Sequence, residues 1–193
     1  MPKYVFALPN ILTYARVMAV PIVVACFFIH GSLSLEKNAR YTAAGIFFLA
    51  SVTDFFDGYL ARIWQQSSAL GRLLDPIADK LLVSACLLLL VADRTITEWN
   101  LWAAIIILCR EILVSGLREY LAEVKVSIPV SRLAKWKTAA QMFSLLFLLI
   151  GSAVPVSFSA IIVSGLALLW IAALLTLVTG YDYVRHGLSH VTL

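Results

Sequence analysis

Long apolar runs separated by short polar segments dominate the chain. The runs extend over Val17–Ile29, Tyr41–Phe56, Asp75–Ala92, Trp99–Leu117 and Thr138–Tyr181. A membrane-spanning helix needs about 20 mostly apolar residues. The last run is too long for one span and carries Gly151 and Pro155, typical turn residues, near its middle. The pattern predicts six spanning helices, and the amphipathic residues 1–16 predict a short interfacial helix before the first span.

The composition agrees with a membrane protein. Hydrophobic residues make up 62% of the 193 residues and charged residues only 13%, against about 45–50% and 25% in soluble domains. This composition excludes a soluble globular domain, and the length leaves no room for a separate catalytic one. We expect a single all-α membrane-embedded domain over residues 1–193, surrounded by lipid, with no nucleic acid as a partner.

Lys and Arg are distributed unevenly between the two predicted sides of the membrane. The side with both termini and the second and fourth connections collects Lys3, Arg16, Arg62, Arg72, Lys80, Arg118, Lys125, Arg132, Lys135, Lys137 and Arg185. The opposite side has only Lys37, Arg40 and Arg94, and Arg110 falls inside a span. Because basic residues concentrate on the cytoplasmic side, we predict that this side, and the chemistry with it, faces the cytoplasm.

The candidate chemistry lies in residues 54–79. At 100° per helical residue, Asp54, Asp57, Gly58, Ala61 and Arg62 fall within one sector of about 140°. Asp75 and Asp79 are four residues apart and share a face of the next helix. Gly71 fits a turn between the two helices. The spacing therefore predicts a helical hairpin with four carboxylates facing one another.

Four carboxylates at the end of an apolar bundle repel one another, and divalent cations relieve that repulsion. Oxygen ligands suit Mg²⁺, Mn²⁺ or Ca²⁺, and a pair of metals is a common clamp for displacement at phosphorus. Gly58 and Ala61 leave room for a diphosphate, which Arg62 can bind. The alternatives are acids solvated at the membrane edge or the cation pathway of a transporter. A transporter should bury polar residues in several spans, and we expect none in the last two.

The spacing D-x2-D-G-x2-A-R-x8-G-x3-D-x3-D is met at every fixed position, and it resembles the signature of the CDP-alcohol phosphatidyltransferases. The resemblance implies a membrane enzyme, a homodimer of the bacterial inner membrane, that transfers the phosphatidyl group of CDP-diacylglycerol to an alcohol and releases CMP. It implies two Mg²⁺ or Mn²⁺ ions held by Asp54, Asp57, Asp75 and Asp79, with Asp79 also the general base. Gly58, Ala61, Arg62 and Gly71 would form the nucleotide site.

The acceptor site must come from outside this signature. Arg110, Arg118, Lys135, Lys137 and Arg16 all lie near the same membrane side. They are more cationic than a neutral acceptor such as serine or inositol needs, which favours an acceptor that carries a phosphate.

Three segments, residues 9–16, 109–119 and 135–141, resemble those of family members whose acceptor is sn-glycerol 3-phosphate and whose product, phosphatidylglycerophosphate, leads to phosphatidylglycerol and cardiolipin. The resemblance places Asn10 and Thr13 near the nucleotide and the five cations at the acceptor phosphate. Ala134 precedes Lys135 at a position where family members usually have glycine. Serine, inositol and phosphatidylglycerol remain alternative acceptors. An inactive structural member should have lost an aspartate, and none is lost.

Overall fold

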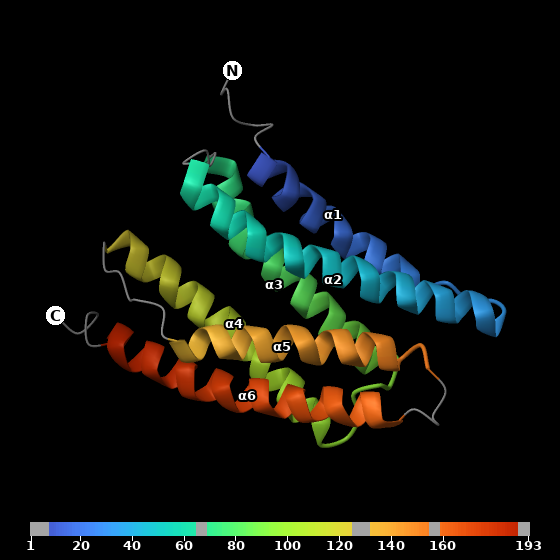
Figure 1. Cartoon of the computed structure of the whole chain (residues 1–193). Coiled ribbons are helices and arrows are strands. Elements are labelled where there is room, and N and C mark those ends of the chain that lie inside the picture. The colour runs from blue at the N-terminus through green and yellow to red at the C-terminus, as the bar shows by residue number, and fades with distance from the viewer. Residues whose placement is uncertain (1–7, 65–68, 125–131, 155–158, 189–193) are drawn as a thin grey trace.

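Six helices form the described part of the chain (Figure 1). The computed structural model describes residues 8–64, 69–124, 132–154 and 159–188, and these contain no strand. The helices are α1 (Leu8–Phe27), α2 (Leu33–Trp64), α3 (Ala69–Ala92), α4 (Asn100–Glu123), α5 (Arg132–Gly151) and α6 (Ser159–Leu188). The all-helical membrane fold expected from the apolar runs is confirmed.

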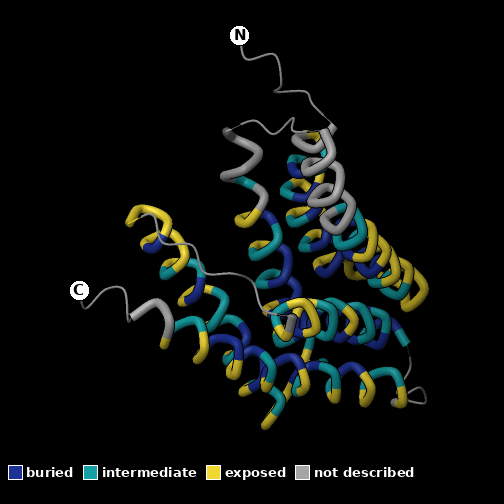
Figure 2. The backbone as a smooth tube through the Cα atoms, turned by 60° about the vertical axis from the view of Figure 1, so that its left-hand side comes forward, coloured by how far each residue is buried: buried dark blue, intermediate teal, exposed yellow. Residues whose placement is uncertain are grey.

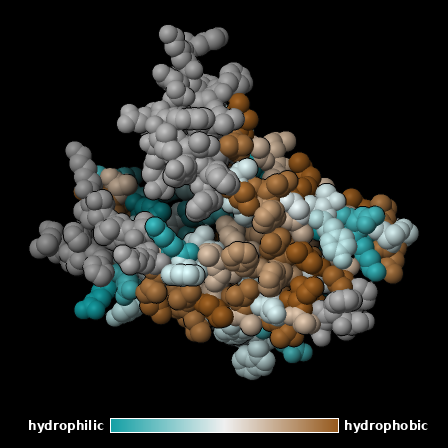
Figure 3. All heavy atoms as spheres, viewed as in Figure 1, coloured by the Kyte–Doolittle hydropathy of each residue, from teal (hydrophilic) through white to brown (hydrophobic). Residues whose placement is uncertain are grey.

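Three helices in the described part have the length and apolarity that a bilayer requires. Within the described residues, Asn100–Glu123, Leu133–Gly151 and Ala160–Arg185 are long and apolar enough to cross a membrane, and Ile11–Phe27 is a shorter apolar helix. The segment expected to be interfacial and the first predicted span form one helix from Leu8 onward, with Pro21 inside it. Hydrophobic side chains cover the middle of the surface, and hydrophilic ones gather toward its two ends (Figure 3).

The helices pack as two groups of three (Figure 2). In one group α1 lies against α2 and α3, and in the other α6 lies against α4 and α5. The groups meet where α2 and α3 approach α5 and where α3 approaches α4. Buried side chains from both groups form one apolar core, which includes Val23, Phe47, Leu87, Leu148 and Leu169.

The α5–α6 hairpin depends on close backbone approach. α5 ends at Gly151, one of the two predicted turn residues. A Cβ atom at Gly151 would lie 2.7 Å from Ile162 Cγ1, and one at Gly165 would lie 2.9 Å from Leu148 Cγ. Ser144 Oγ donates a hydrogen bond to the Gly165 carbonyl at 2.8 Å. Small residues therefore let the two helices touch, as is common between membrane helices.

Two expectations need correction. Gly71 lies in the first turn of α3, not in the turn between the helices. The last two spans also bury polar side chains, which we expected to be missing there: Gln141, Ser144, Thr176 and Thr179. The absence of such residues is therefore not an argument against a transporter.

Candidate active site

The signature residues lie where α2 ends and α3 begins, at one end of the bundle (Figure 1). α2 carries Asp54, Asp57, Gly58, Ala61 and Arg62. α3 carries Gly71, Asp75 and Asp79. The side chains of residues 54–73 and of Asp75 lie outside the described part, so their predicted metal and nucleotide roles stay predictions. Among the described side chains no three His, Cys, Asp or Glu residues meet, and of the four aspartates only Asp79 belongs to that set.

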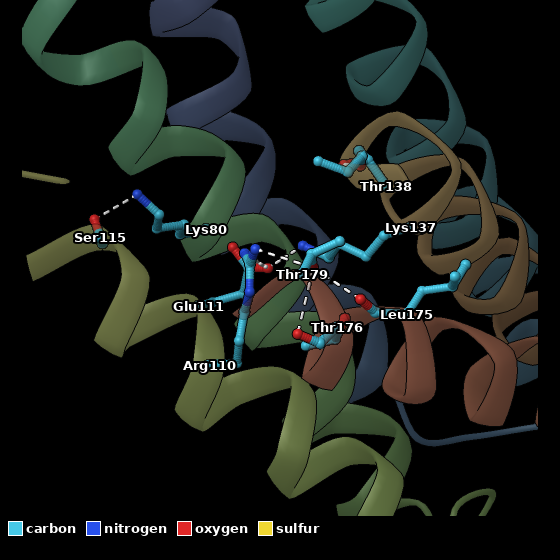
Figure 4. Close-up of polar contacts among 10 residues, drawn as sticks. Lys80, Arg110, Glu111, Ser115, Lys137, Thr138, Leu175, Thr176 and Thr179 are labelled. Atoms are coloured by element: carbon cyan, nitrogen blue, oxygen red, sulfur yellow. Dashed lines mark hydrogen bonds and ion pairs between the residues drawn. The ribbon is translucent and has the colours of Figure 1, made fainter. Parts of the chain in front are cut away.

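Asp79 and its neighbour Lys80 connect the signature to the second group of helices. Lys80 Nζ on α3 donates a hydrogen bond to Ser115 Oγ on α4 at 2.6 Å (Figure 4). Asp79 is partly buried and lies within electrostatic range of Lys137 on α5. The candidate base therefore interacts electrostatically with a cation that the sequence assigned to the acceptor.

Arg110, Glu111 and Lys137 form a largely buried ionic cluster between α4 and α5 (Figure 4). Lys137 Nζ and Arg110 Nη1 both donate to Glu111 Oε1, the latter at 3.3 Å. The exposed fractions of these side chains are 15% for Arg110, 15% for Glu111 and 7% for Lys137. One carboxylate thus holds two cations together, and the trio keeps a formal charge of +1.

The Arg110 side chain also contacts α6. Arg110 Nη2 donates to Thr179 Oγ1 at 3.3 Å. The Thr179 hydroxyl donates in turn to the Leu175 carbonyl at 2.8 Å. Gly180 lies against the arginine stem, because a Cβ atom there would lie 3.0 Å from Arg110 Cγ.

The other predicted acceptor cations occupy different positions. Arg118 is exposed, stacks over the Tyr183 ring at 5.8 Å and lies within electrostatic range of Arg110. Lys135 is exposed on α5 while Lys137 is buried, because residues two apart point about 200° apart around a helix. The structure therefore groups Lys137 and Arg118 with Arg110 and leaves Lys135 at the surface.

Arg16 and Thr13 lie in α1 and are almost fully buried, with exposed fractions of 1% and 3%. Because α1 packs on α2 and α3, both side chains belong to the half of the bundle that carries the signature. The side chain of Asn10 lies outside the described part. The nucleotide role of Asn10 and Thr13 and the acceptor role of Arg16 remain predictions.

The residues that support the cations were not predicted from the sequence as their partners: Glu111, Ser115, Thr179 and Gly180. An acid next to an arginine inside an apolar helix is a usable signal. The Thr179–Gly180 pair offers none, because such residues are ordinary in membrane helices.

The sequence of the chain also matches known proteins. The sequence model described as CDP-alcohol phosphatidyltransferase matches residues 6–178, most of the chain. The chain belongs to the CDP-alcohol phosphatidyltransferase family. The matched range holds the complete signature and the ionic cluster, and it ends one residue before Thr179.

Curated relatives cover nearly the whole chain. A Rickettsia felis protein is 49% identical over 181 residues, which span 92% of this chain and 93% of that protein. An Escherichia coli protein is 40% identical over 181 residues and 93% of each chain. A Cereibacter sphaeroides protein is 38% identical, over 96% of this chain and 97% of that protein. All three are named CDP-diacylglycerol–glycerol-3-phosphate 3-phosphatidyltransferase.

Proposed function

We propose that this protein transfers the phosphatidyl group of CDP-diacylglycerol to sn-glycerol 3-phosphate, giving phosphatidylglycerophosphate and CMP. The observation that carries the proposal is the largely buried ionic cluster of Arg110, Glu111 and Lys137. Lys137 of this cluster also interacts electrostatically with Asp79 of the nucleotide-lipid signature. The names of the relatives, at up to 49% identity over most of the chain, support the same acceptor.

The ionic cluster favours an anionic acceptor on physical grounds. Arg110 has five N–H donors and Lys137 has three. Glu111 and Thr179 accept only some of them. A cluster with spare donors and a net positive charge binds a phosphate better than a neutral hydroxyl compound, since charge-assisted hydrogen bonds are the stronger kind. Serine and inositol offer no such group.

We propose that Asp54, Asp57, Asp75 and Asp79 hold two Mg²⁺ or Mn²⁺ ions. Four carboxylates from the adjoining ends of two helices are a suitable oxygen donor set for these cations. When bound, such a pair neutralises the diphosphate and stabilises charge on the attacking and leaving oxygens.

The chain's own residues supply orientation and proton transfer. In this proposal Arg110 and Lys137 bind the phosphate group of glycerol 3-phosphate, so that a hydroxyl group of its glycerol part approaches the lipid-side phosphorus. The hydroxyl oxygen forms the new P–O bond, the bond to the CMP oxygen breaks, and Asp79 takes the hydroxyl proton. Gly58, Ala61, Arg62 and Gly71 would contact the cytidine diphosphate, with Asn10 and Thr13 nearby.

An apolar cavity beside the signature suits the lipid chains. It has a volume of about 340 Å³ and is lined by Phe47, Phe48, Ser51, Val52, Met142, Phe143 and Leu146. These residues come from α2 and α5, and Asp54 follows Ser51 by three residues on α2. An acyl chain in this cavity would keep the diphosphate close to the aspartates.

The charge asymmetry supports an inner-membrane protein whose site faces the cytoplasm, and the family resemblance supports a homodimer. Single cysteines introduced in place of Lys135 and Arg94 test the orientation. Impermeant thiol reagents should label the Arg94 position in intact cells and the Lys135 position only after lysis. Cross-linking in native membranes tests the dimer, and a single-chain mass under all conditions would contradict it.

The decisive experiment is CMP release by purified protein in detergent with CDP-diacylglycerol and Mg²⁺. Glycerol 3-phosphate, serine, inositol, phosphatidylglycerol and no acceptor are compared, with EDTA as the metal control. We expect release with glycerol 3-phosphate alone, lost in EDTA and lost in a folded Asp79→Asn variant. CMP release with another alcohol would refute the assignment of glycerol 3-phosphate as the acceptor. No release with any acceptor would refute the enzyme, and cation flux in liposomes would then test the transporter alternative.

A further inference from the structure

α6 takes no part in the signature, yet its last turns contact both arginines of α4. Thr179 accepts a hydrogen bond from Arg110, and Gly180 packs on the stem of the same side chain. One turn further on, the Tyr183 ring lies under the guanidinium of Arg118 at 5.8 Å, within the usual range of a cation–π contact. The contacts with Arg110 are specific enough to test.

We infer that Thr179 and Gly180 are positioning residues that hold the Arg110 guanidinium in the orientation needed to bind the acceptor phosphate. The inference rests on the proposed function and adds to it two α6 residues that touch neither substrate. Both lie beyond residue 178, where the family match ends.

The Thr179 hydroxyl is oriented by hydrogen bonds within its own helix. Its single hydroxyl proton is directed at backbone carbonyls of its own helix, that of Leu175 at 2.8 Å and that of Thr176 at 3.3 Å. The oxygen therefore presents lone pairs to Arg110 Nη2, at 3.3 Å. Because the proton points toward the helix backbone, the lone pairs of the oxygen have a set direction, and this favours one position for Nη2 of the guanidinium.

Gly180 fixes the stem. A Cβ atom there would lie 3.0 Å from Arg110 Cγ and 3.5 Å from Arg110 Nε. Any side chain would therefore displace the arginine by a few tenths of an ångström. Gly180 is buried and helical and its φ is not positive, so a need for unusual backbone angles does not explain a glycine here. The close approach of Arg110 does.

The arrangement is poorly explained as a stabilising contact alone. Among the described residues Arg110 Nε is buried and has no hydrogen-bond partner, and an unpartnered buried donor costs stability. Arg110 is therefore a buried cation that has one unsatisfied donor and belongs to a cluster with a net positive charge. That cost is reasonable when the side chain is preset for an anionic ligand, since a preorganised clamp loses little freedom on binding.

Matched variants test the inference. Thr179→Val keeps the shape and removes the acceptor, and Gly180→Ala adds one methyl group against Arg110. The first control is Thr42→Val, which removes a hydroxyl that donates in the same way to the carbonyl four residues earlier. The second is Gly45→Ala, because an added Cβ there meets nothing within 4 Å. Both controls lie on α2, far from Arg110 along the chain.

We expect Thr179→Val and Gly180→Ala each to raise the KM for glycerol 3-phosphate about tenfold, the factor that corresponds to 1.4 kcal/mol. The KM for CDP-diacylglycerol should change less than twofold, and the controls should change neither constant. Stabilisation against heat by glycerol 3-phosphate should weaken in the same two variants. In an Arg110→Ala background, Gly180→Ala should have no further effect, because it acts through the missing side chain.

An unchanged KM for glycerol 3-phosphate in both variants would overturn the inference, and so would an equal rise in both KM values, which indicates a merely structural role. If one variant does not fold, the other decides. The proposed function is judged separately on the wild-type protein. If the wild type releases CMP with glycerol 3-phosphate and the variants behave like it, only the positioning role fails.

Discussion

Glu111 should be essential for keeping Arg110 and Lys137 in one place, and Glu111→Gln tests this directly. The substitution keeps the shape and removes the charge that the two cations share. Two donors that each lie about 3 Å from one oxygen are roughly 5 Å apart. Two unit charges at that separation repel by about 3 kcal/mol at an effective dielectric constant near 20. Loss of the shared carboxylate from a pair that is mostly buried costs a similar amount, about 3–5 kcal/mol.

We therefore expect Glu111→Gln to lower the free energy of unfolding by about 3 kcal/mol and the Tm by about 6–12 °C for a chain of this size. Unfolding is measured in mixed micelles by SDS titration and by a thermal scan in detergent. Lys137→Met removes one cation, so the double variant should recover at least about 1 kcal/mol, which a double-mutant cycle reports as coupling.

Glu123→Gln serves as the control, because it makes the same change on the same helix at an exposed position and should stay within about 0.5 kcal/mol of the wild type. The reasoning is refuted if Glu111→Gln is as stable as this control. It is also refuted if the effects of Glu111→Gln and Lys137→Met simply add, since the two side chains would then not share an interaction.

Four further outcomes follow from described contacts. Arg110→Lys should raise the KM for glycerol 3-phosphate at least about tenfold, because a lysine lacks the fork of donors; an unchanged KM would remove Arg110 from the acceptor site. Ser51→Leu should partly fill the apolar cavity and raise the KM for long-chain CDP-diacylglycerol, with a smaller effect for short-chain lipid. Ser115→Ala frees Lys80 and should lower kcat several-fold with both KM values unchanged. Gly165→Ala should cost about 1–3 kcal/mol of stability through its contact with Leu148, measured by SDS titration.

The helices were predictable because apolar runs of about 20 residues have few alternatives in a bilayer. Their ends were less predictable. Hydropathy placed the second span at Tyr41–Phe56, whereas α2 has 32 residues, from Leu33 to Trp64, and only the spacing of the signature predicted helix beyond Phe56. Hydropathy reports where a helix leaves the apolar layer. Backbone hydrogen bonds continue beyond that point, and Asp54 and Asp57 do not interrupt them.

The candidate site was also predictable only in part. Fixed spacing along two neighbouring helices identified the signature, and the charges inside or near spans identified Arg110, Arg118 and Lys137. The partners of these cations on other helices could not be derived from the sequence. Arg110 and Thr179 are 69 residues apart, and helical periodicity relates residues within one helix only. Which helices become neighbours depends on packing between the two groups, and a threonine in an apolar helix carries no mark of the helix it faces.

In the proposed function the two groups of helices divide the two substrates largely between them. α1, α2 and α3 carry the residues assigned to the metals and the nucleotide, together with Arg16, whereas α4 and α5 carry the other four cations assigned to the acceptor phosphate and α6 supports Arg110. The reaction needs a hydroxyl on one group to meet a phosphorus on the other, so its rate depends on how the groups are held together. The Lys80–Ser115 hydrogen bond crosses that boundary, and so does the electrostatic interaction between Lys137 and Asp79. Changes within one group should therefore alter the KM of one substrate, while changes at the boundary should alter kcat. This separation is what a site assembled from two preformed halves requires, and it is what the Ser115 and Gly180 variants compare.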